Sequence, residues 1–158
     1  MVVLSIGGNL GNRLENISHA IDYIEEQIGT ILHCSSVYES EAWGFKTKHR
    51  FLNVTVAVET LLQPESLLQK TLEIETIMGR VRNKTGYASR TMDIDILFID
   101  NKIIDTQTLT IPHPRLHKRR FILLPLSEII PDKIHPVFQK NIATLLAECN
   151  DKGKVRML

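Results

Sequence analysis

The chain has 158 residues, of which 43% are hydrophobic and 23% charged, and its formal net charge is +1. This composition is ordinary for a globular protein, and the length suits one domain, which we expect to span residues 1–158. A charge so near zero gives no global field for nucleic acid or membranes, so any basic character must be local.

The cysteines and the N-terminal sequence give no sign of a disulfide framework or a targeting signal. Cys34 and Cys149 are too few for a disulfide framework and predict reduced thiols. Met1 leads into an apolar run without a basic segment, and no apolar run is long enough to span a membrane. We therefore expect a cytoplasmic protein, a monomer that binds neither nucleic acid nor membrane.

The N-terminal segment predicts a strand followed by a helix. Residues 2–6 form a short apolar run, and a glycine-rich turn follows. From Arg13 to about Gln27, apolar residues recur at helical spacing. Asn12 is the expected N-cap, and Gly29 stands where the helix ends.

Two strands and a second helix are predicted next. The β-branched and aromatic run 30–38 predicts a strand, 39–50 a polar loop, and the alternating run 51–60 another strand. Pro64 opens a helix that Gly79 ends. The apolar stripe of this helix is predicted to comprise Leu67, Leu68, Leu72 (or Thr71), Ile74 and Met78.

A further strand over 93–99 completes the order β-α-β-β-α-β. This order predicts an α+β fold with a ferredoxin-like antiparallel sheet and helices packed on it. The remaining chain predicts a C-terminal extension. It comprises a short hairpin at 101–109, a proline-rich turn at 111–114 and helices near 119–128 and 142–148.

The segment 90–99, R-T-M-D-I-D-I-L-F-I, carries two carboxylates into an apolar strand. Because strand side chains alternate, Asp93 and Asp95 should share one face with Leu97 and Ile99. The other face should carry Ile94, Ile96 and Phe98. Paired carboxylates repel each other and resist burial, so the pattern favours a hard cation such as Mg²⁺ bound together with phosphates. A solvated edge strand remains the alternative on this pattern alone.

Basic residues form two clusters that contain no acid. The first comprises Arg80, Arg82, Lys84 and Arg90; the second comprises His113, Arg115, His117, Lys118, Arg119 and Arg120. Charge runs are usually solvated loops, but both clusters flank the carboxylate strand. Arginine suits bidentate phosphate contacts, so the combination is typical of phosphoryl-type transfer.

Aromatic residues lie in or beside the predicted loops. With Asn53 as an edge-reading amide, they would form a slot for a flat heterocycle; they are Trp43, Phe45, Phe51, Tyr87 and Phe121. The glycine-rich run 6–11 lacks the lysine of a P-loop and predicts only a tight turn. The same fold order also occurs in single-strand RNA readers and small regulatory modules. The RNA readers' aromatic motif is absent here.

Four segments together carry a family resemblance. They are I-G-G-N-L-G at 6–11, F-L-N-V-T-V-A-V-E-T at 51–60, G-R-V-R at 79–82 followed by S-R-T-M-D-I-D-I-L at 89–97, and L-T-I-P-H-P-R-L-H-K-R-R-F-I-L-L-P-L at 109–126. Over nearly its whole length the chain resembles the 6-hydroxymethyl-7,8-dihydropterin pyrophosphokinases of folate biosynthesis. The resemblance implies pyrophosphate transfer from ATP to the pterin hydroxymethyl group, with release of AMP.

The resemblance also assigns roles to individual residues. It implies two Mg²⁺ ions on Asp93 and Asp95, with Arg80 and Arg90 as catalytic arginines of a mobile loop. The implied ATP contacts are Leu68, Arg82, Arg90, Ile96, Thr110, His113 and Arg119. The implied pterin contacts are Ser40, Glu41, Trp43, Phe51, Asn53 and Phe121.

Some positions depart from the family's common pattern. Gly86 stands where a basic residue is common, Tyr87 where tryptophan is common, Pro114 where an aromatic residue is common, and His117 where lysine is common. These changes affect the expected ATP side more than the chemistry. We expect the loop 81–89 to be mobile and to order over bound nucleotide.

Overall fold

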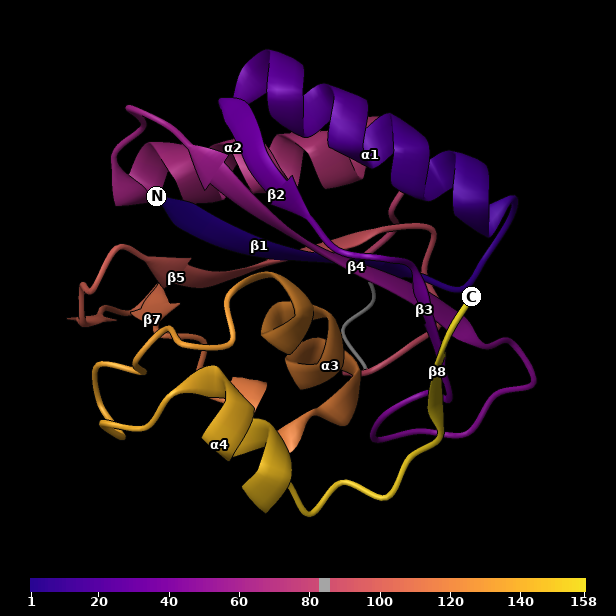
Figure 1. Cartoon of the computed structure of the whole chain (residues 1–158). Helices are drawn as coiled ribbons and strands as arrows, with labels where there is room; N and C mark the ends of the chain where they lie inside the picture. The colour runs from indigo at the N-terminus through magenta and orange to yellow at the C-terminus, as the bar shows by residue number, and fades with distance from the viewer. Residues whose placement is uncertain (83–85) are drawn as a thin grey trace.

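The computed structural model describes residues 1–82 and 86–158, and a six-stranded antiparallel sheet forms its centre (Figure 1). Its strands are β1 Val2–Gly8, β2 Thr30–Cys34, β3 Tyr38–Ser40, β4 Phe51–Glu59, β5 Asp93–Ile99 and β8 Val155–Met157. They run in the order β5-β1-β4-β3-β8, and β2 also pairs with β4. The predicted combination of helices with an antiparallel sheet is confirmed.

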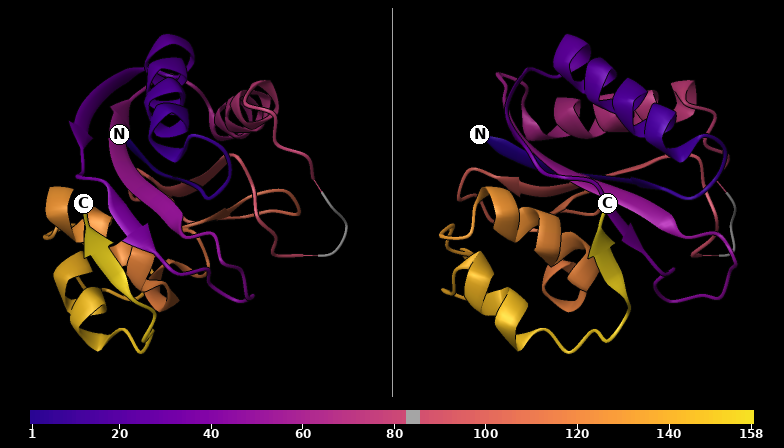
Figure 2. Two further views of the ribbon diagram at one scale, coloured as in Figure 1. Left: turned by 90° about the vertical axis from the view of Figure 1, so that its right-hand side faces the viewer. Right: turned by 45° about the vertical axis from the view of Figure 1, so that its right-hand side comes forward.

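Helices cover both faces of the sheet (Figure 2). The remaining elements are α1 Arg13–Gln27, α2 Pro64–Ile77, β6 Ile104–Asp105, β7 Thr110–Ile111, a 3-10 turn Leu116–Lys118, α3 Arg120–Ile129 and α4 Ile142–Glu148. One apolar core lies under α1 and α2, and a second lies under α3 and α4. Within residues 1–82 and 86–158, no helix is both long enough and apolar enough to cross a membrane.

The N-terminal strand and helix are confirmed. The strand extends two residues beyond the prediction, and α1 has the predicted bounds. Asn12 Oδ1 accepts a hydrogen bond from Glu15 N at 3.3 Å, which satisfies one of the free amides at the helix N-terminus.

The prediction of one continuous strand over 30–38 is wrong. The chain forms β2 and β3, which are separated by residues 35–37 and both pair with β4. Ser35 breaks the strand because its side-chain Oγ accepts the hydrogen bond of Thr55 N at 3.0 Å. In a continuous strand, a backbone oxygen would accept this hydrogen bond. Glu39 and Ser40, predicted in a loop, belong to β3.

The alternation predicted for β5 holds only as far as Leu97. At a register shift opposite β1, Leu97 has no partner residue, and the strand bulges. Leu97 and Phe98 therefore both lie in the core under α3 and α4, whereas Ile99 lies in the core under α1 and α2. The prediction that Ile99 shares the face of the aspartates, and that Phe98 does not, is wrong.

Helix α2 begins at Pro64 as predicted and is followed by Gly79 in the left-handed region at φ +82°. Of the two candidates for its apolar stripe, Thr71 is buried and Leu72 is 38% exposed. Glu75 also lies on the buried side of the helix and is 2% exposed, which the sequence analysis did not predict.

The C-terminal helices lie within one residue of their predicted bounds. The hairpin lies further along the chain than predicted, because β6 pairs with β7 at Thr110–Ile111. Strand β8 was not predicted. It is short and largely exposed, and it pairs with β3 at the edge of the sheet.

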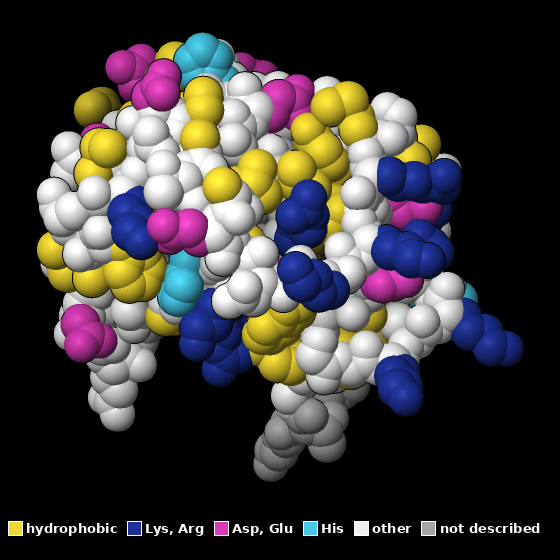
Figure 3. Space-filling model, turned by 60° about the horizontal axis from the view of Figure 1, so that its bottom comes forward, with side chains coloured by type: hydrophobic (Ala, Val, Ile, Leu, Met, Phe, Trp, Pro, Cys, Tyr) yellow, Lys and Arg dark blue, Asp and Glu magenta, His cyan; other side chains and the backbone are white. Residues whose placement is uncertain are grey.

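Basic side chains gather locally despite the near-zero net charge. Figure 3 shows Lys and Arg over the middle and right of one face of the molecule. Residues 83–85, which include Lys84 and the centre of the loop predicted to order over nucleotide, lie outside the described residues.

Gly29 is required by close packing against β4. A Cβ atom at this position would lie 2.1 Å from the backbone oxygen of Glu59. We expect Gly29→Ala to lower the free energy of unfolding by about 2–3 kcal/mol in urea titrations, because the backbone must move apart.

The matched control is Gly79→Ala, where a Cβ would meet nothing within 4 Å and only the positive φ opposes substitution. This variant should lose about 1 kcal/mol. Equal losses in the two variants would contradict the packing explanation.

Candidate active site

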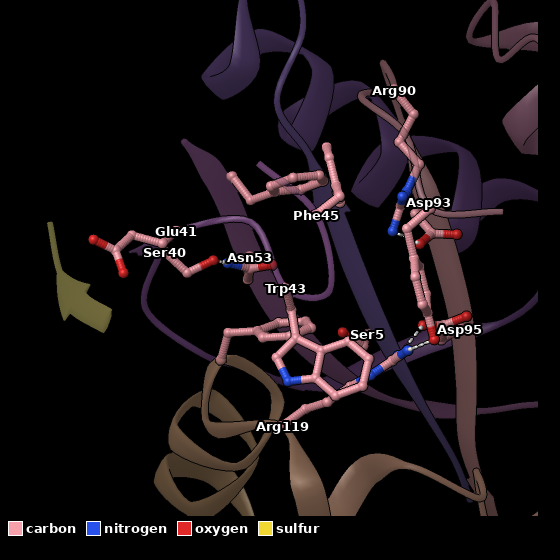
Figure 4. A pocket seen from close by; sticks show the side chains of 14 residues that line it. Ser5, Ser40, Glu41, Trp43, Phe45, Asn53, Arg90, Asp93, Asp95 and Arg119 are labelled. Atoms are coloured by element: carbon pink, nitrogen blue, oxygen red, sulfur yellow. Dashed lines mark hydrogen bonds and ion pairs between the residues drawn. The ribbon is translucent and has the colours of Figure 1, made fainter. Parts of the chain in front are cut away.

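Two pockets meet at the aspartate pair of β5. The first is lined by Ser5, Gly7, Ser40, Glu41, Trp43, Phe45, Phe51, Asn53, Tyr87, Arg90, Asp93, Asp95, Arg119 and Phe121 (Figure 4). The second is lined by Arg80, Gly86, Tyr87, Arg90, Asp93, Asp95, His113, Pro114, Arg115 and Arg119. The first pocket carries five aromatic side chains and the second carries four arginines, so they suit a flat ring and an anion respectively.

The floor of the first pocket is made by small residues of β1. Ser5 pairs with Asp95 in the sheet, and Gly7 pairs with Asp93. Neither was predicted as a site residue, although Ser5 is the one polar side chain in the apolar run 2–6. Small side chains here leave space above the sheet beside the carboxylates.

Asp93 is held by two arginines. Its Oδ1 lies 2.5 Å from Arg80 Nη1, and its Oδ2 lies 2.6 Å from Arg90 Nη2. Burial alone would raise the pKa of Asp93, but Arg90 and Arg80 outweigh burial and hold the pKa below its ordinary value. Asp93 is therefore charged at neutral pH.

Asp95 has much weaker partners. Its Oδ2 lies 3.7 Å from Arg119 Nη1 and 3.9 Å from His113 Nε2. Burial, and then the charge of Asp93, raise the pKa of Asp95 to about 7. Burial, and then Arg119, lower the pKa of His113 to about 4, so this imidazole is neutral at pH 7.

Glu75 is the main site-supporting residue that the sequence analysis missed. Its Oε1 accepts from Arg80 Nη1 at 2.7 Å and from Ile94 N at 2.8 Å, and its Oε2 pairs with Arg82. Arg80 thus bridges Glu75 and Asp93. The signal was present in the sequence, because Glu75 lies four residues after Thr71 on the buried side of α2.

Arg119 lies among aromatic rings where the pockets meet. Its guanidinium carbon is 4.7 Å from the ring centre of Trp43 and 5.8 Å from those of Tyr87 and Phe121. Its Nη2 donates to Tyr87 Oη at 3.2 Å. Cation–π contacts of this kind fix both the guanidinium and the rings.

Asn9 connects the two loops that border the site. Its Nδ2 donates to His49 O at 3.1 Å and to Ser89 Oγ at 3.0 Å, and its Oδ1 accepts from Arg90 N at 2.8 Å. The turn predicted at 6–11 therefore has a second role, since its asparagine positions the chain around Arg90.

The structure brings all six predicted pterin contacts into the first pocket: Ser40, Glu41, Trp43, Phe51, Asn53 and Phe121. Asn53 Nδ2 donates to Ser40 Oγ at 2.8 Å, which orients the amide. Phe45, noted among the loop aromatics, also lines the pocket and packs edge-on against Phe51.

The predicted ATP contacts are more dispersed. Arg80, Arg90, His113 and Arg119 line the second pocket. Arg82 pairs with Glu75 outside the lining, and Thr110 borders a neighbouring hollow together with His117. Leu68 and Ile96 pack in the core under α1 and α2. Among the departures from the family pattern, the second pocket is lined by Gly86, Tyr87 and Pro114.

Comparison with known proteins agrees with this arrangement. A family model described as 7,8-dihydro-6-hydroxymethylpterin-pyrophosphokinase (HPPK) matches residues 3–131. The chain belongs to the HPPK family. It is 42% identical over 139 residues to 2-amino-4-hydroxy-6-hydroxymethyldihydropteridine pyrophosphokinase of Aquifex aeolicus, covering 88% of this chain and 86% of that protein. It is 38% identical to the Porphyromonas gingivalis protein of the same name, covering 86% of this chain and 94% of that protein.

Solved HPPK structures share the fold. An HPPK-DHPS in complex with substrates superposes with a TM-score of 0.75 at 19% identity, covering 93% of this chain and 42% of that chain. Wild-type Plasmodium falciparum HPPK-DHPS gives a TM-score of 0.73 at 20% identity, covering 93% of this chain and 44% of that chain. This chain therefore spans less than half the length of those two proteins.

The raised pKa of Asp95 predicts a pH-dependent effect of its removal. The folded pKa of about 7 exceeds the ordinary 3.8, so ionisation of Asp95 reduces stability as pH rises from about 4 to 7. Asp95→Asn should therefore match the wild-type Tm near pH 4 and exceed it by about 10 °C at pH 8. Differential scanning fluorimetry across this range, with the exposed Asp132→Asn as control, measures the difference. A gain that does not change with pH would contradict the assigned cause.

Glu75 should be essential to stability. We expect Glu75→Leu to lower the free energy of unfolding by about 3 kcal/mol, because Arg80 loses a buried partner and Ile94 N–H loses its acceptor. The control is Glu73→Leu in the same helix, whose solvent-accessible ion pair with Lys70 should contribute little to stability. Urea unfolding compares them, and similar small losses in both variants would refute the role.

Proposed function

We infer that this chain transfers pyrophosphate from ATP to the hydroxymethyl group of 6-hydroxymethyl-7,8-dihydropterin, releasing AMP, in folate biosynthesis. The observation that carries this inference is the meeting of an aromatic and a cationic pocket at one carboxylate pair, in a chain of the HPPK family. The alternative of a non-catalytic nucleotide- or RNA-binding module has no support from the comparisons.

The reaction requires the two substrates to meet end to end. The pterin hydroxyl oxygen attacks the β-phosphorus of ATP, the bond from that phosphorus to the α-phosphate oxygen breaks, and AMP leaves with the electron pair. The hydroxyl proton is lost to solvent or to a phosphate oxygen. Catalysis of such a step is mostly positioning and charge neutralisation.

The first pocket suits the pterin. Phe51 and Phe121 would stack on its faces, and Asn53 would read the polar edge of the ring. Ser40, Glu41 and Trp43 would contact it from β3 and the following loop. The hydroxymethyl group would then point toward Asp93 and Asp95, which line both pockets.

The second pocket suits the triphosphate. Arg80, Arg90, His113 and Arg119 would contact its oxygens, with Arg82 adding charge at the edge. We propose that Leu68, Ile96 and Thr110 lie toward the adenosine. Arg119 Nε is buried without a hydrogen-bond partner among the described residues, which fits a donor reserved for ligand.

We further propose that Asp93 and Asp95 hold Mg²⁺, with two ions expected. The Asp95 carboxylate fits this role, because it has no partner within 3.5 Å in the described residues and its burial beside Asp93 favours a cation. The Asp93 carboxylate pairs with Arg80 and Arg90 and would exchange one of these contacts for the metal. Bound Mg²⁺ would neutralise phosphate charge and align the β-phosphorus with the attacking oxygen.

Several finer properties are also proposals. They are a ferredoxin-like topology within one domain over 1–158, a C-terminal extension packed on the core, a monomeric state, a cytoplasmic location and no nucleic-acid or membrane partner. The strand order and the two cores support the topology.

Pterin-dependent release of AMP tests the proposed function directly. Purified chain with ATP, Mg²⁺ and 6-hydroxymethyl-7,8-dihydropterin should release AMP, and omission of pterin or addition of EDTA should abolish the release. ADP as the product would exclude attack at the β-phosphorus. Release that persists in EDTA would exclude the metal requirement.

Replacement of Asp95 should separate chemistry from folding. Asp95→Ala should lower AMP release by at least about a thousandfold, because a carboxylate ligand of the metal is lost, while far-UV circular dichroism stays unchanged. Asp132→Ala, at an exposed acid after α3, is the control and should keep full activity. Substantial turnover by Asp95→Ala would refute the metal role.

A further inference from the structure

The segment 151–157 spans two walls of the first pocket, although it lies beyond the residues that match the HPPK family model. At one end it contacts the start of α3, and at the other end it forms β8 beside β3 (Figure 1). These two walls carry pocket residues that the sequence places far apart.

The α3 wall lacks a cap of its own. Arg119 occupies the N-cap position, makes no side-chain capping bond and extends into the site instead. Asp151 supplies the missing acceptor, because its Oδ2 accepts from Arg120 N at 2.9 Å. Its Oδ1 accepts from Gly153 N at 2.9 Å, which closes a tight turn.

The capped amide stands between two pocket residues. Arg119 immediately precedes Arg120, and Phe121 immediately follows it, and both line the first pocket. The negative charge of Asp151 also lies at the positive end of the α3 dipole. No acid is present in the first turn of α3 itself, so this charge comes from the distant segment.

The β3 wall is held by the same segment. Glu41 N donates to Lys154 O at 3.2 Å, and Lys154 N donates to Glu41 Oε2 at 3.3 Å. Further along, Arg156 Nη2 donates to Glu39 Oε1 at 2.8 Å. Ser40, which orients Asn53, pairs with Val155 in the sheet.

We propose that Asp151 is a positioning residue for the pterin pocket. Through its hydrogen bonds to Arg120 and Gly153, Asp151 sets the spacing between the α3 wall and the β3 wall. This proposal rests on the proposed function. Asp151 is not among the residues that line the first pocket. It acts through Arg119 and Phe121, whose backbone it fixes at the start of α3.

Kinetics of full-length variants test this role. Asp151→Ala should raise KM for the pterin about tenfold and change kcat less than about twofold, since the pocket wall moves but the carboxylate pair does not. Asp151→Asn, which keeps one oxygen acceptor, should fall between Asp151→Ala and wild type. The matched control is Glu148→Ala, an exposed acid whose ion pair within the described residues is with Lys140, and it should behave as wild type.

A spectroscopic readout distinguishes positioning from stability. Trp43 is the only tryptophan of the chain, and Arg119 lies over its ring, so its emission reports this wall without any substrate. Asp151→Ala should shift the emission, and Glu148→Ala should not. If Asp151→Ala leaves both the emission and the KM for the pterin unchanged, the positioning role is overturned. It is likewise overturned if the variant lowers Tm and kcat and leaves KM unchanged.

The same experiment separates the two proposals. A wild-type chain that releases no AMP with pterin would overturn the proposed function, and the emission of Trp43 in Asp151→Ala would still test the positioning role. Normal wild-type turnover combined with wild-type behaviour of Asp151→Ala would overturn the positioning role alone.

Discussion

The site depends on how charge is shared between two carboxylates on one buried strand face. Asp93 and Asp95 cannot both be ionised cheaply in this position, because each raises the cost of charging the other. The arginines resolve the conflict unequally. Arg80 and Arg90 neutralise Asp93, while Asp95 keeps weak partners and a pKa of about 7. The free site is thus prepared to accept positive charge at one carboxylate.

The unequal neutralisation of Asp93 and Asp95 depends on a residue of helix α2. Arg80 is positioned to contact Asp93 by its ion pair with Glu75 of α2. Glu75 in turn accepts a hydrogen bond from the backbone N–H of Ile94 in β5. A helix that packs on one face of the sheet therefore helps to position Arg80, one of the two arginines that keep Asp93 charged on the other side of the strand. On that side, Arg119 and Tyr87 border both pockets, so a group bound in one pocket lies beside the walls of the other.

Local patterns in the sequence were sufficient for most elements. The spacing around α1 and its cap at Asn12 predicted the helix bounds, because both depend on neighbouring residues alone. The break at Ser35 could not be predicted, since its side chain accepts a hydrogen bond from the backbone of Thr55, which is twenty residues away in the sequence. Strand β8 has only three residues, which are largely exposed, and it is held by its pairing with the distant strand β3. Asp151 as a cap for α3 has the same origin in a distant contact.

The residues of the candidate site also divide into those visible as local sequence patterns and those that depend on distant contacts. The aspartate pair and the arginine clusters were visible as patterns, and all six pterin contacts that the family resemblance implied converge on one pocket. Glu75 was missed because an acid in a helical stripe normally indicates exposure, and only the three partners of its carboxylate explain its burial.

The bulge at Leu97 gives β5 one residue that has no partner in the neighbouring strand β1. The strand carries one residue more than the segment of β1 opposite it, and this extra residue lets the aspartates and Phe98 lie on the same side of the sheet. Deletion of Leu97 would restore regular pairing and leave the remaining side chains of β5 on the faces of the sheet where they already lie. Deletion of Ile94, by contrast, would put Asp93 and Asp95 on opposite faces. The strand can therefore lose its unpaired residue and keep its two-sided pattern, whereas it cannot lose a paired residue between the aspartates without separating them.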